Sequence, residues 1–238
     1  MIRLDKYLAD MGIGTRSEVK NIIRKKQVSV NGIPISKPET KVDITKDTVC
    51  YQGKPVAYEP YVYYMLNKPC GCVSAVKDNL YPTVLSFIEN PKGYDLFPVG
   101  RLDLDTEGLL LITNDGTLAH ELLSPKKHVT KTYFAKVQGR VTTEDVKRFS
   151  LGLDINEEKP TRPATLVIEK SDDISEIRVS ITEGKYHQVK RMFEAVGKQV
   201  LFLKRLSMGT LQLDETLTPG TYRALTTEEL SALKNRTI

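Results

Sequence analysis

Three carboxylates at alternate positions form the segment of this sequence best suited to acid–base chemistry. They are Asp103, Asp105 and Glu107. Arg101 precedes them, and a fully apolar run at residues 109–112 follows and ends at a turn signal, Asn-Asp-Gly. This pattern predicts an acidic loop that leads into a buried strand, and such loops often carry catalytic groups. From spacing alone, a solvated acidic loop with Arg101 as its counter-ion fits equally well.

A second segment gathers basic side chains where a predicted strand turns into a predicted helix. They are Lys185, His187, Lys190 and Arg191. Cations near a helix N-terminus favour anions, although a surface helix with a basic polar face and a packing or capping histidine explains the same residues. Adjacent helical residues point about 100° apart, so at most one of Lys190 and Arg191 is expected to reach any given site.

Motifs for cofactor, metal and serine chemistry are absent from the sequence. There is no Walker loop, no G-x-G-x-x-G after a strand and no G-x-S-x-G elbow. The three histidines are scattered, and Cys70 and Cys72 form a C-x-C with no second pair. We therefore expect reduced thiols, no metal site, no cofactor, and catalysis by carboxylates and basic groups.

Composition indicates a small basic unit followed by a nearly neutral one. The chain has 238 residues and a net charge of +5, enough for a medium domain plus a small one. Residues 1–60 carry 11 Lys and Arg against 7 Asp and Glu, whereas the remainder carries 24 against 23. This asymmetry favours a polyanion such as nucleic acid as the partner. No apolar run spans a membrane and no signal-peptide core begins the chain, so we expect a cytoplasmic protein.

The first fifty residues predict two short helices and a hairpin. A helix is expected over residues 3–12, and a second begins at Thr15 with Glu18 in capping-box spacing. The hairpin is expected at residues 27–35, around Asn31-Gly32. Basic side chains cluster along these elements; a solvated helix face would explain them, but the small number of nearby acids favours contacts with phosphates. These basic residues are Arg3, Lys6, Arg16, Lys20, Arg24, Lys25 and Lys26.

This segment resembles the S4 RNA-binding domain. The matching residues are Arg3-Leu4-Asp5-Lys6-Tyr7-Leu8, Arg16-Ser17 and Val28-Ser29-Val30-Asn31-Gly32. The resemblance implies binding to structured RNA through its backbone. We expect an S4-like domain with its linker over residues 1–58, the linker lying at 51–60, and a larger domain over residues 59–238.

The larger domain is predicted to be α+β, with a mixed, mainly antiparallel sheet. Helices are expected at residues 82–88, 117–123, 142–149, 186–196 and 226–235. Strands are expected at residues 61–66, 109–112, 131–137, 165–169, 176–182 and 199–203. Most connections between strands are too short for regular βαβ crossovers.

Several motifs of this domain resemble those of the RNA pseudouridine synthases. The signature is Gly100-Arg101-Leu102-Asp103-Leu104-Asp105-Thr106-Glu107-Gly108-Leu109-Leu110, flanked by Asn67-Lys68-Pro69, Lys131-Thr132-Tyr133 and Lys185-Tyr186-His187-Gln188-Val189-Lys190-Arg191-Met192. With the S4-like start, the resemblance covers nearly the whole chain. Within this family the chain is most similar to the branch that acts on small-subunit rRNA. The branches that act on large-subunit rRNA usually have Asn-Arg where this chain has Tyr186-His187.

The resemblance implies that Asp103 is the catalytic aspartate, with Lys190 beside it and Tyr133 stacking on the target base. A uridine in folded RNA must be flipped out, and Arg101 is expected to hold that geometry. Lys185, His187 and Arg191 are expected to contact RNA. The isomerisation gains and loses no atoms, so it requires no metal or redox cofactor.

The expected partner is 16S rRNA or a small-subunit assembly particle, bound by a monomer. Three other functions remain open at this point. They are a 23S rRNA pseudouridine synthase, a non-catalytic S4-type RNA-binding or assembly protein, and a glycosidase with paired carboxylates. The acidic loop speaks against a passive RNA binder, and the lack of tryptophan platforms speaks against the glycosidase.

Overall fold

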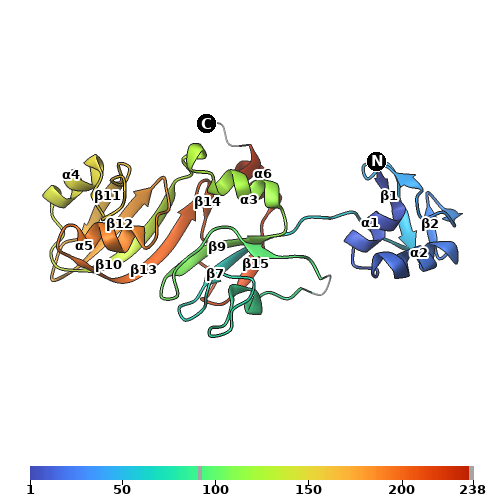
Figure 1. Ribbon diagram of the computed structural model, residues 1–238, viewed down its shortest axis with the longest axis horizontal. Coiled ribbons are helices and arrows are strands. Elements are labelled where there is room, and N and C mark those ends of the chain that lie inside the picture. The colour runs from blue at the N-terminus through green and yellow to red at the C-terminus, as the bar shows by residue number, and fades with distance from the viewer. Residues whose placement is uncertain (91–92, 236–238) are drawn as a thin grey trace. The chain divides into compact units, whose positions relative to one another are not determined.

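The computed structural model describes residues 1–90 and 93–235. The chain forms two compact units, which are described separately (Figure 1). The first comprises Met1–Val62 and Glu89–Asp95, and the second comprises Tyr63–Ile88 and Leu96–Ile238. The expected domain boundary at residues 58 and 59 stays a prediction.

Two helices and short β-strands make up the first unit. Their bounds are β1 Ile2–Arg3, α1 Leu4–Asp10, α2 Arg16–Arg24, β2 Val28–Val30, β3 Ile33–Ile35, β4 Lys41–Val42, β5 Val49–Tyr51 and β6 Lys54–Pro55. The capping box at the start of α2 is present, since the Thr15 hydroxyl accepts from the Glu18 backbone and the Glu18 carboxylate accepts from the Thr15 backbone. The core packs the apolar side of both helices on the strands, through residues such as Leu4, Leu8, Val19, Ile23, Val28, Val42 and Val49.

Tight hairpins connect neighbouring strands of this unit. Between β2 and β3, Asn31 and Gly32 have φ of 51° and 79°, as the Asn-Gly signal predicted. The expectation of an irregular linker over residues 51–60 is wrong for its first half, where β5 and β6 form a second hairpin. Gln52 and Gly53 adopt φ of 49° and 79° there, and Pro55 is tolerated because β6 is an edge strand.

A mixed, mainly antiparallel sheet forms the centre of the second unit, and it confirms the predicted α+β class (Figure 1). Its strands pair in the order β11-β12-β10-β13-β9-β7-β15, with β14 on β13 and β8 on β9. Their bounds are β7 Tyr63–Lys68, β8 Phe97–Pro98, β9 Glu107–Thr113, β10 Lys131–Gln138, β11 Thr165–Lys170, β12 Ile174–Ile181, β13 Gln199–Met208, β14 Leu211–Gln212 and β15 Tyr222–Ala224. Among the described strands, only β9 and β13 pair in parallel, through Glu107–Lys204 and Gly108–Arg205.

Four α-helices and two 3₁₀ turns accompany this sheet in the part of the second unit that the structure describes. Their bounds are η1 Val84–Phe87, α3 Gly116–Leu123, η2 Pro125–Lys127, α4 Thr143–Leu151, α5 Gln188–Glu194 and α6 Thr227–Lys234. Asp115, Thr142 and Thr226 occupy the N-cap positions of α3, α4 and α6. The helix expected at residues 82–88 is only a 3₁₀ turn, and the strand expected at residues 199–203 continues to Met208.

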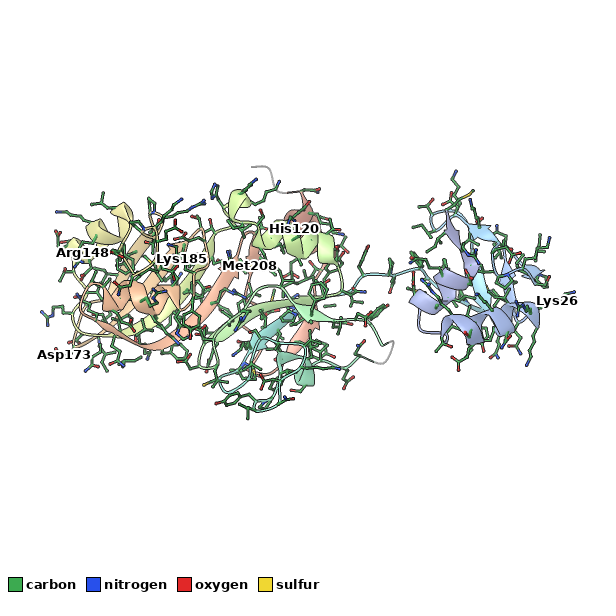
Figure 2. The ribbon with its side chains drawn as sticks, viewed as in Figure 1. Lys26, His120, Arg148, Asp173, Lys185 and Met208 are labelled. Carbon is green, nitrogen blue, oxygen red and sulfur yellow. The ribbon has the colours of Figure 1, made fainter. Side chains whose placement is uncertain are left out.

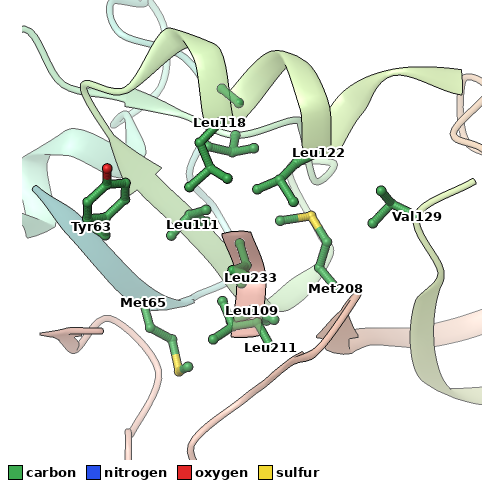
Figure 3. Close-up of a cluster of buried hydrophobic side chains, with 12 residues drawn as sticks. Tyr63, Met65, Leu109, Leu111, Leu118, Leu122, Val129, Met208, Leu211 and Leu233 are labelled. Atoms are coloured by element: carbon green, nitrogen blue, oxygen red, sulfur yellow. The ribbon is translucent and has the colours of Figure 1, made fainter. Parts of the chain in front are cut away.

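The apolar run after the acidic loop is the most buried strand of the second unit. Leu109, Leu110, Leu111 and Ile112 of β9 are fully buried. Figure 3 shows Leu109 and Leu111 packed with Leu118 and Leu122 of α3. Because this strand is held on both faces, it gives a rigid base to the loop that precedes it.

Candidate active site

The acidic loop at residues 101–106 is fastened from below by a buried lysine. Lys68, at the end of β7, is fully buried. Its Nζ donates to the carbonyl oxygens of Asp103 at 3.0 Å, Thr106 at 2.9 Å and Pro69 at 3.1 Å. Burial lowers the pKa of Lys68 from its ordinary value. An ammonium group with several carbonyl partners therefore fixes the backbone of the loop on the sheet.

The neighbouring segment at residues 69–74 holds the other side of the same loop. The Ser74 hydroxyl donates to the Leu102 carbonyl at 3.0 Å and accepts from the Leu102 N–H at 3.0 Å. The Gly71 N–H donates to the Leu104 carbonyl at 2.8 Å. With Lys68, these contacts fix the backbone on both sides of Asp103.

The Asp103 carboxylate faces two basic side chains of the 185–191 segment. Lys190 Nζ lies 3.3 Å from Oδ2, and His187 Nε2 lies 3.5 Å from Oδ1. The Asp103 side chain is 29% exposed, so it remains open to a ligand. The histidine contact is an ion pair only when the imidazole is protonated.

Asp105 shares Lys190 with Asp103 and lies closer to it. The distance from Lys190 Nζ to Asp105 Oδ1 is 2.6 Å, and Asp105 is 65% exposed. Burial alone would lower the pKa of Lys190, but the Asp105 hydrogen bond and the charges of both acids together raise it. Partial burial alone would raise the pKa of Asp105, but the hydrogen bond and charge of Lys190 lower it. Lys190 thus stays protonated between the two carboxylates.

The start of α5 differs from the prediction of a helix from residue 186. His187 is the N-cap in a left-handed conformation with φ of 48°, and α5 begins at Gln188. The Gln188 side chain accepts from the Lys185 N–H at 2.9 Å and donates to Glu183 at 3.0 Å. This local network bends the chain before the helix, which turns His187 towards Asp103.

Lys190 and Arg191 diverge, as their positions on a helix require. Arg191 donates to Glu157 at 2.6 Å and to the backbone carbonyl of Ile155. Lys185, labelled beside α5 in Figure 2, donates to the backbone carbonyls of Lys159 and Pro160. Both cations therefore bind the connection between α4 and β11, and their predicted contact with RNA stays a prediction.

Tyr133 and Arg101 occupy very different surroundings. Tyr133 lies in β10 and is only 7% exposed. Arg101 is exposed, and no hydrogen bond or ion pair of its side chain is found in the described part of the chain. A buried ring suits a stacking surface and a free guanidinium suits RNA, but both roles stay predictions.

Two buried cations beneath the loop had no predicted role. They are Lys68 and Arg205, which are 0% and 2% exposed. Lys68 belongs to the Asn67-Lys68-Pro69 motif, whose resemblance to the family did not indicate a role for the lysine. Arg205 lies on the same face of β13 as the buried Leu203 and Ser207, because every second side chain of a strand points the same way.

The cations of the first unit that were predicted to contact RNA differ in whether they form ion pairs. Arg3 and Lys6 form ion pairs with Asp5 at 2.8 Å and Asp10 at 2.7 Å. The others form no ion pair within residues 1–90 and 93–235, and Lys26 is labelled in Figure 2. They are Arg16, Lys20, Arg24, Lys25 and Lys26. Unpaired cations are suited to phosphate contacts, and the predicted contacts with RNA stay a prediction.

Residues 62–195 match the family described as RNA pseudouridylate synthase, and residues 2–49 match the S4 domain. The chain belongs to the RNA pseudouridylate synthase family and is a pseudouridine synthase with an S4 domain. This membership excludes both the glycosidase and the non-catalytic RNA-binding protein. In the described residues no group of three or more His, Cys, Asp or Glu could hold a metal ion, and no helix could cross a membrane.

Particular relatives are similar over nearly their full length. An uncharacterized RNA pseudouridine synthase, YtzG of Bacillus subtilis, is 46% identical over 98% of both chains. The ribosomal small subunit pseudouridine synthase A of Escherichia coli is 39% identical over 98% of this chain and 100% of that protein. A crystal structure of a pseudouridylate synthase superposes with a TM-score of 0.68 at 38% identity, covering 98% of this chain and 100% of that one.

Proposed function

We propose that this enzyme isomerises one uridine of 16S rRNA to pseudouridine and that Asp103 is its catalytic aspartate. The observation that carries the choice of aspartate is the position of Asp103. It lies on a loop held by Lys68, faces Lys190 and His187, and keeps a partly exposed carboxylate. Similarity along the full chain to small-subunit enzymes, 39–41% identical, supports 16S rRNA as the substrate.

The reaction breaks the N1–C1′ bond of uridine and rejoins the uracil to the ribose through C5. C5 then loses its proton, N1 gains one, and the nucleotide has the same atoms as before. Asp103 acts as an anion, either by attacking C1′ or by removing a proton from the sugar. Both routes need an ionised carboxylate, and Lys190 Nζ lies 3.3 Å from its Oδ2 as a counter-ion.

The decisive test of the aspartate compares two variants of neighbouring acids. Asp103→Asn should abolish pseudouridine formation, a loss of more than about 10⁴-fold if the carboxylate reacts with the sugar. RNA affinity should remain within a few-fold, because the amide keeps the shape of the side chain. The matched control is Asp105→Asn, which also loses a contact with Lys190 but should keep measurable activity. An active Asp103→Asn enzyme contradicts the assignment. If Asp105→Asn is inactive at the same time, Asp105 is the catalytic residue instead.

The choice of RNA is tested in cells that lack the protein. Chemical labelling maps pseudouridines in 16S and 23S rRNA before and after the wild-type gene is returned. We expect one 16S position to lose its pseudouridine and to regain it with wild-type protein only. Loss confined to 23S rRNA would identify the chain as a large-subunit enzyme of the same family.

A further inference from the structure

A row of register partners crosses the sheet beneath the catalytic loop. Lys68 pairs with Gly108, Gly108 with Arg205, and Arg205 with Tyr133. Side chains of residues directly opposite each other on neighbouring strands lie on the same face. Because Lys68 binds the loop backbone at Asp103 and Thr106, this is the face on which the loop lies. Arg205 therefore stands between Tyr133 and the lysine that carries the loop.

Gly108 brings Arg205 unusually close to the start of β9. A Cβ added to Gly108 would lie 2.3 Å from the Arg205 carbonyl oxygen, and φ of Gly108 is +100°. No other residue fits at this position, so no side chain separates Lys68 from Arg205 along the row.

One terminal nitrogen of the Arg205 guanidinium group, Nη2, is buried and has no hydrogen-bond partner among the described residues. The side chain is 2% exposed, and Nε donates to the Leu109 carbonyl at 2.7 Å. No carboxylate in the described part of the chain pairs with the side chain. A buried donor is normally hydrogen-bonded to protein, ligand or ordered water, so Nη2 has a free donor for one further acceptor.

We propose that Arg205 donates a hydrogen bond to a carbonyl oxygen of the flipped uracil and stabilises its negative charge during the reaction. This inference rests on the proposed function. When N1–C1′ breaks, the electron pair stays on the uracil and its charge spreads from N1 onto O2 and O4. The same pair forms the C5–C1′ bond afterwards, so the charge exists only between the two bonds. A fixed guanidinium favours that state without transferring a proton.

The proposal is tested by single-turnover rates of the Arg205→Lys enzyme on RNAs in which O2 or O4 of the target uracil is replaced by sulfur. The RNAs contain uridine, 2-thiouridine or 4-thiouridine at the modified position. Arg205→Lys should slow the reaction of uridine about 10- to 100-fold, as expected for one charge-assisted hydrogen bond. Arg178→Lys is the matched control, since it makes the same change on β12 at an exposed position, and it should leave the rate unchanged.

The sulfur series separates substrate contact from a purely structural role. Sulfur is a poor acceptor, so the oxygen-to-sulfur rate ratio should fall at least about five-fold in Arg205→Lys at the contacted position, O2 or O4. The intrinsic effect of sulfur on the leaving uracil cancels in this comparison. An unchanged ratio at both positions, or a normal rate on uridine, overturns the proposal.

A crystal structure of the Asp103→Asn enzyme with unreacted uridine RNA decides the question if Arg205→Lys does not fold. Nη2 should then lie about 2.7–3.2 Å from O2 or O4. A separation beyond hydrogen-bond range from both oxygens overturns the inference while leaving the proposed function intact. A wild-type enzyme that forms no pseudouridine in 16S rRNA refutes the proposed function instead.

Discussion

Lys190 is the cation shared by Asp103 and Asp105, and its charge is what distinguishes this loop from a merely acidic one. Its Nζ lies 3.3 Å from Asp103 and 2.6 Å from Asp105. The shorter contact goes to the more exposed acid, so Asp105 holds the lysine in place while Asp103 stays available. This division of roles between two neighbouring carboxylates follows from their different distances to one ammonium group.

Replacing Lys190 tests whether its charge supports the reaction. We expect Lys190→Met to lower the single-turnover rate about 10- to 1000-fold, because two adjacent carboxylates lose their common counter-ion. Lys190→Arg, which keeps the charge, should recover most of the rate. The rates are measured at saturating enzyme, so that a change in RNA affinity does not contribute. A Met variant with the wild-type rate contradicts this role.

The residues of the site differ in how far the sequence reveals them. Asp103 and Lys190 lie in motifs whose types and spacing are visible locally. Arg205 is 97 residues beyond Gly108, and their contact depends on a two-residue parallel pairing that no local pattern encodes. Arg205 lies beyond the strand predicted at residues 199–203, so no burial was predicted for it.

Lys68 connects β7 with the catalytic loop, and replacing it tests whether this connection stabilises the fold. Lys68→Met keeps the length of the side chain but removes the buried ammonium group and its hydrogen bonds to the carbonyls of Pro69, Asp103 and Thr106. We expect the free energy of unfolding to fall by about 2–4 kcal/mol, measured by urea denaturation. The exposed Lys77→Met is the control and should change it by less than about 0.5 kcal/mol. Equal stability of both variants would show that Lys68 does not fasten the loop.

A second ion-pair network joins α6 to the segment after β14 and makes stability depend on acid. Arg223 bridges Asp214 at 2.6 Å and Glu229 at 2.8 Å, and hydrogen bonds from Thr216 and Arg223 lower the pKa of Asp214 to about 2. The stability that Asp214 contributes is complete above its unfolded-state pKa of about 4 and is lost as the pH falls through about 2.

Removing this titration should flatten the acid limb of the stability curve. We expect Asp214→Asn to be less stable than wild type at pH 6 and to approach it at pH 2, as measured by the thermal unfolding midpoint. Asp173→Asn, at an exposed position, is the control and should run parallel to wild type at every pH. Parallel curves for Asp214→Asn as well would show that this carboxylate does not stabilise the fold.

Predictions of helices and turns succeeded where particular side chains specify the structure. They failed where residues adopt backbone conformations that their side chains do not favour. The capping box of Thr15 and Glu18 and the Asn31-Gly32 turn are specified by side chains, and both are present. The β5–β6 hairpin turns through Gln52 and Gly53, a pair with no strong turn preference at its first position. His187 delays α5 by adopting a left-handed conformation that favours Gly or Asn, so the helical pattern gave no sign of it.

At the scale of the whole molecule, the candidate catalytic groups and most of the excess of basic over acidic residues lie in different compact units. The paired groups around Asp103 belong to the second unit, whereas the unpaired cations of α2 belong to the first. The charge asymmetry of the sequence predicted this division, since it needs only composition. The order of strands in the sheet could not be predicted in the same way, because β9 pairs with strands far away in both directions along the chain.

This division predicts that binding and chemistry respond to different substitutions. The double change Lys20→Ala and Arg24→Ala should weaken RNA binding and reduce the slope of log K against log salt by about 1.4–1.8, since each lost phosphate contact accounts for about 0.7–0.9. At saturating enzyme the single-turnover rate should stay within about two-fold of wild type, because the catalytic groups are untouched. Filter binding across salt concentrations and rapid-quench kinetics provide the two measurements.

The control for this double variant keeps the same loss of charge within the same unit. Lys41→Ala with Lys46→Ala removes two exposed cations outside α2 and should leave the salt slope nearly unchanged. If both double variants reduced the slope equally, the first unit would act through its net charge and not through the surface of α2. A slower single-turnover rate at saturation would show instead that these cations also position the uridine for reaction, which the present division of roles does not allow.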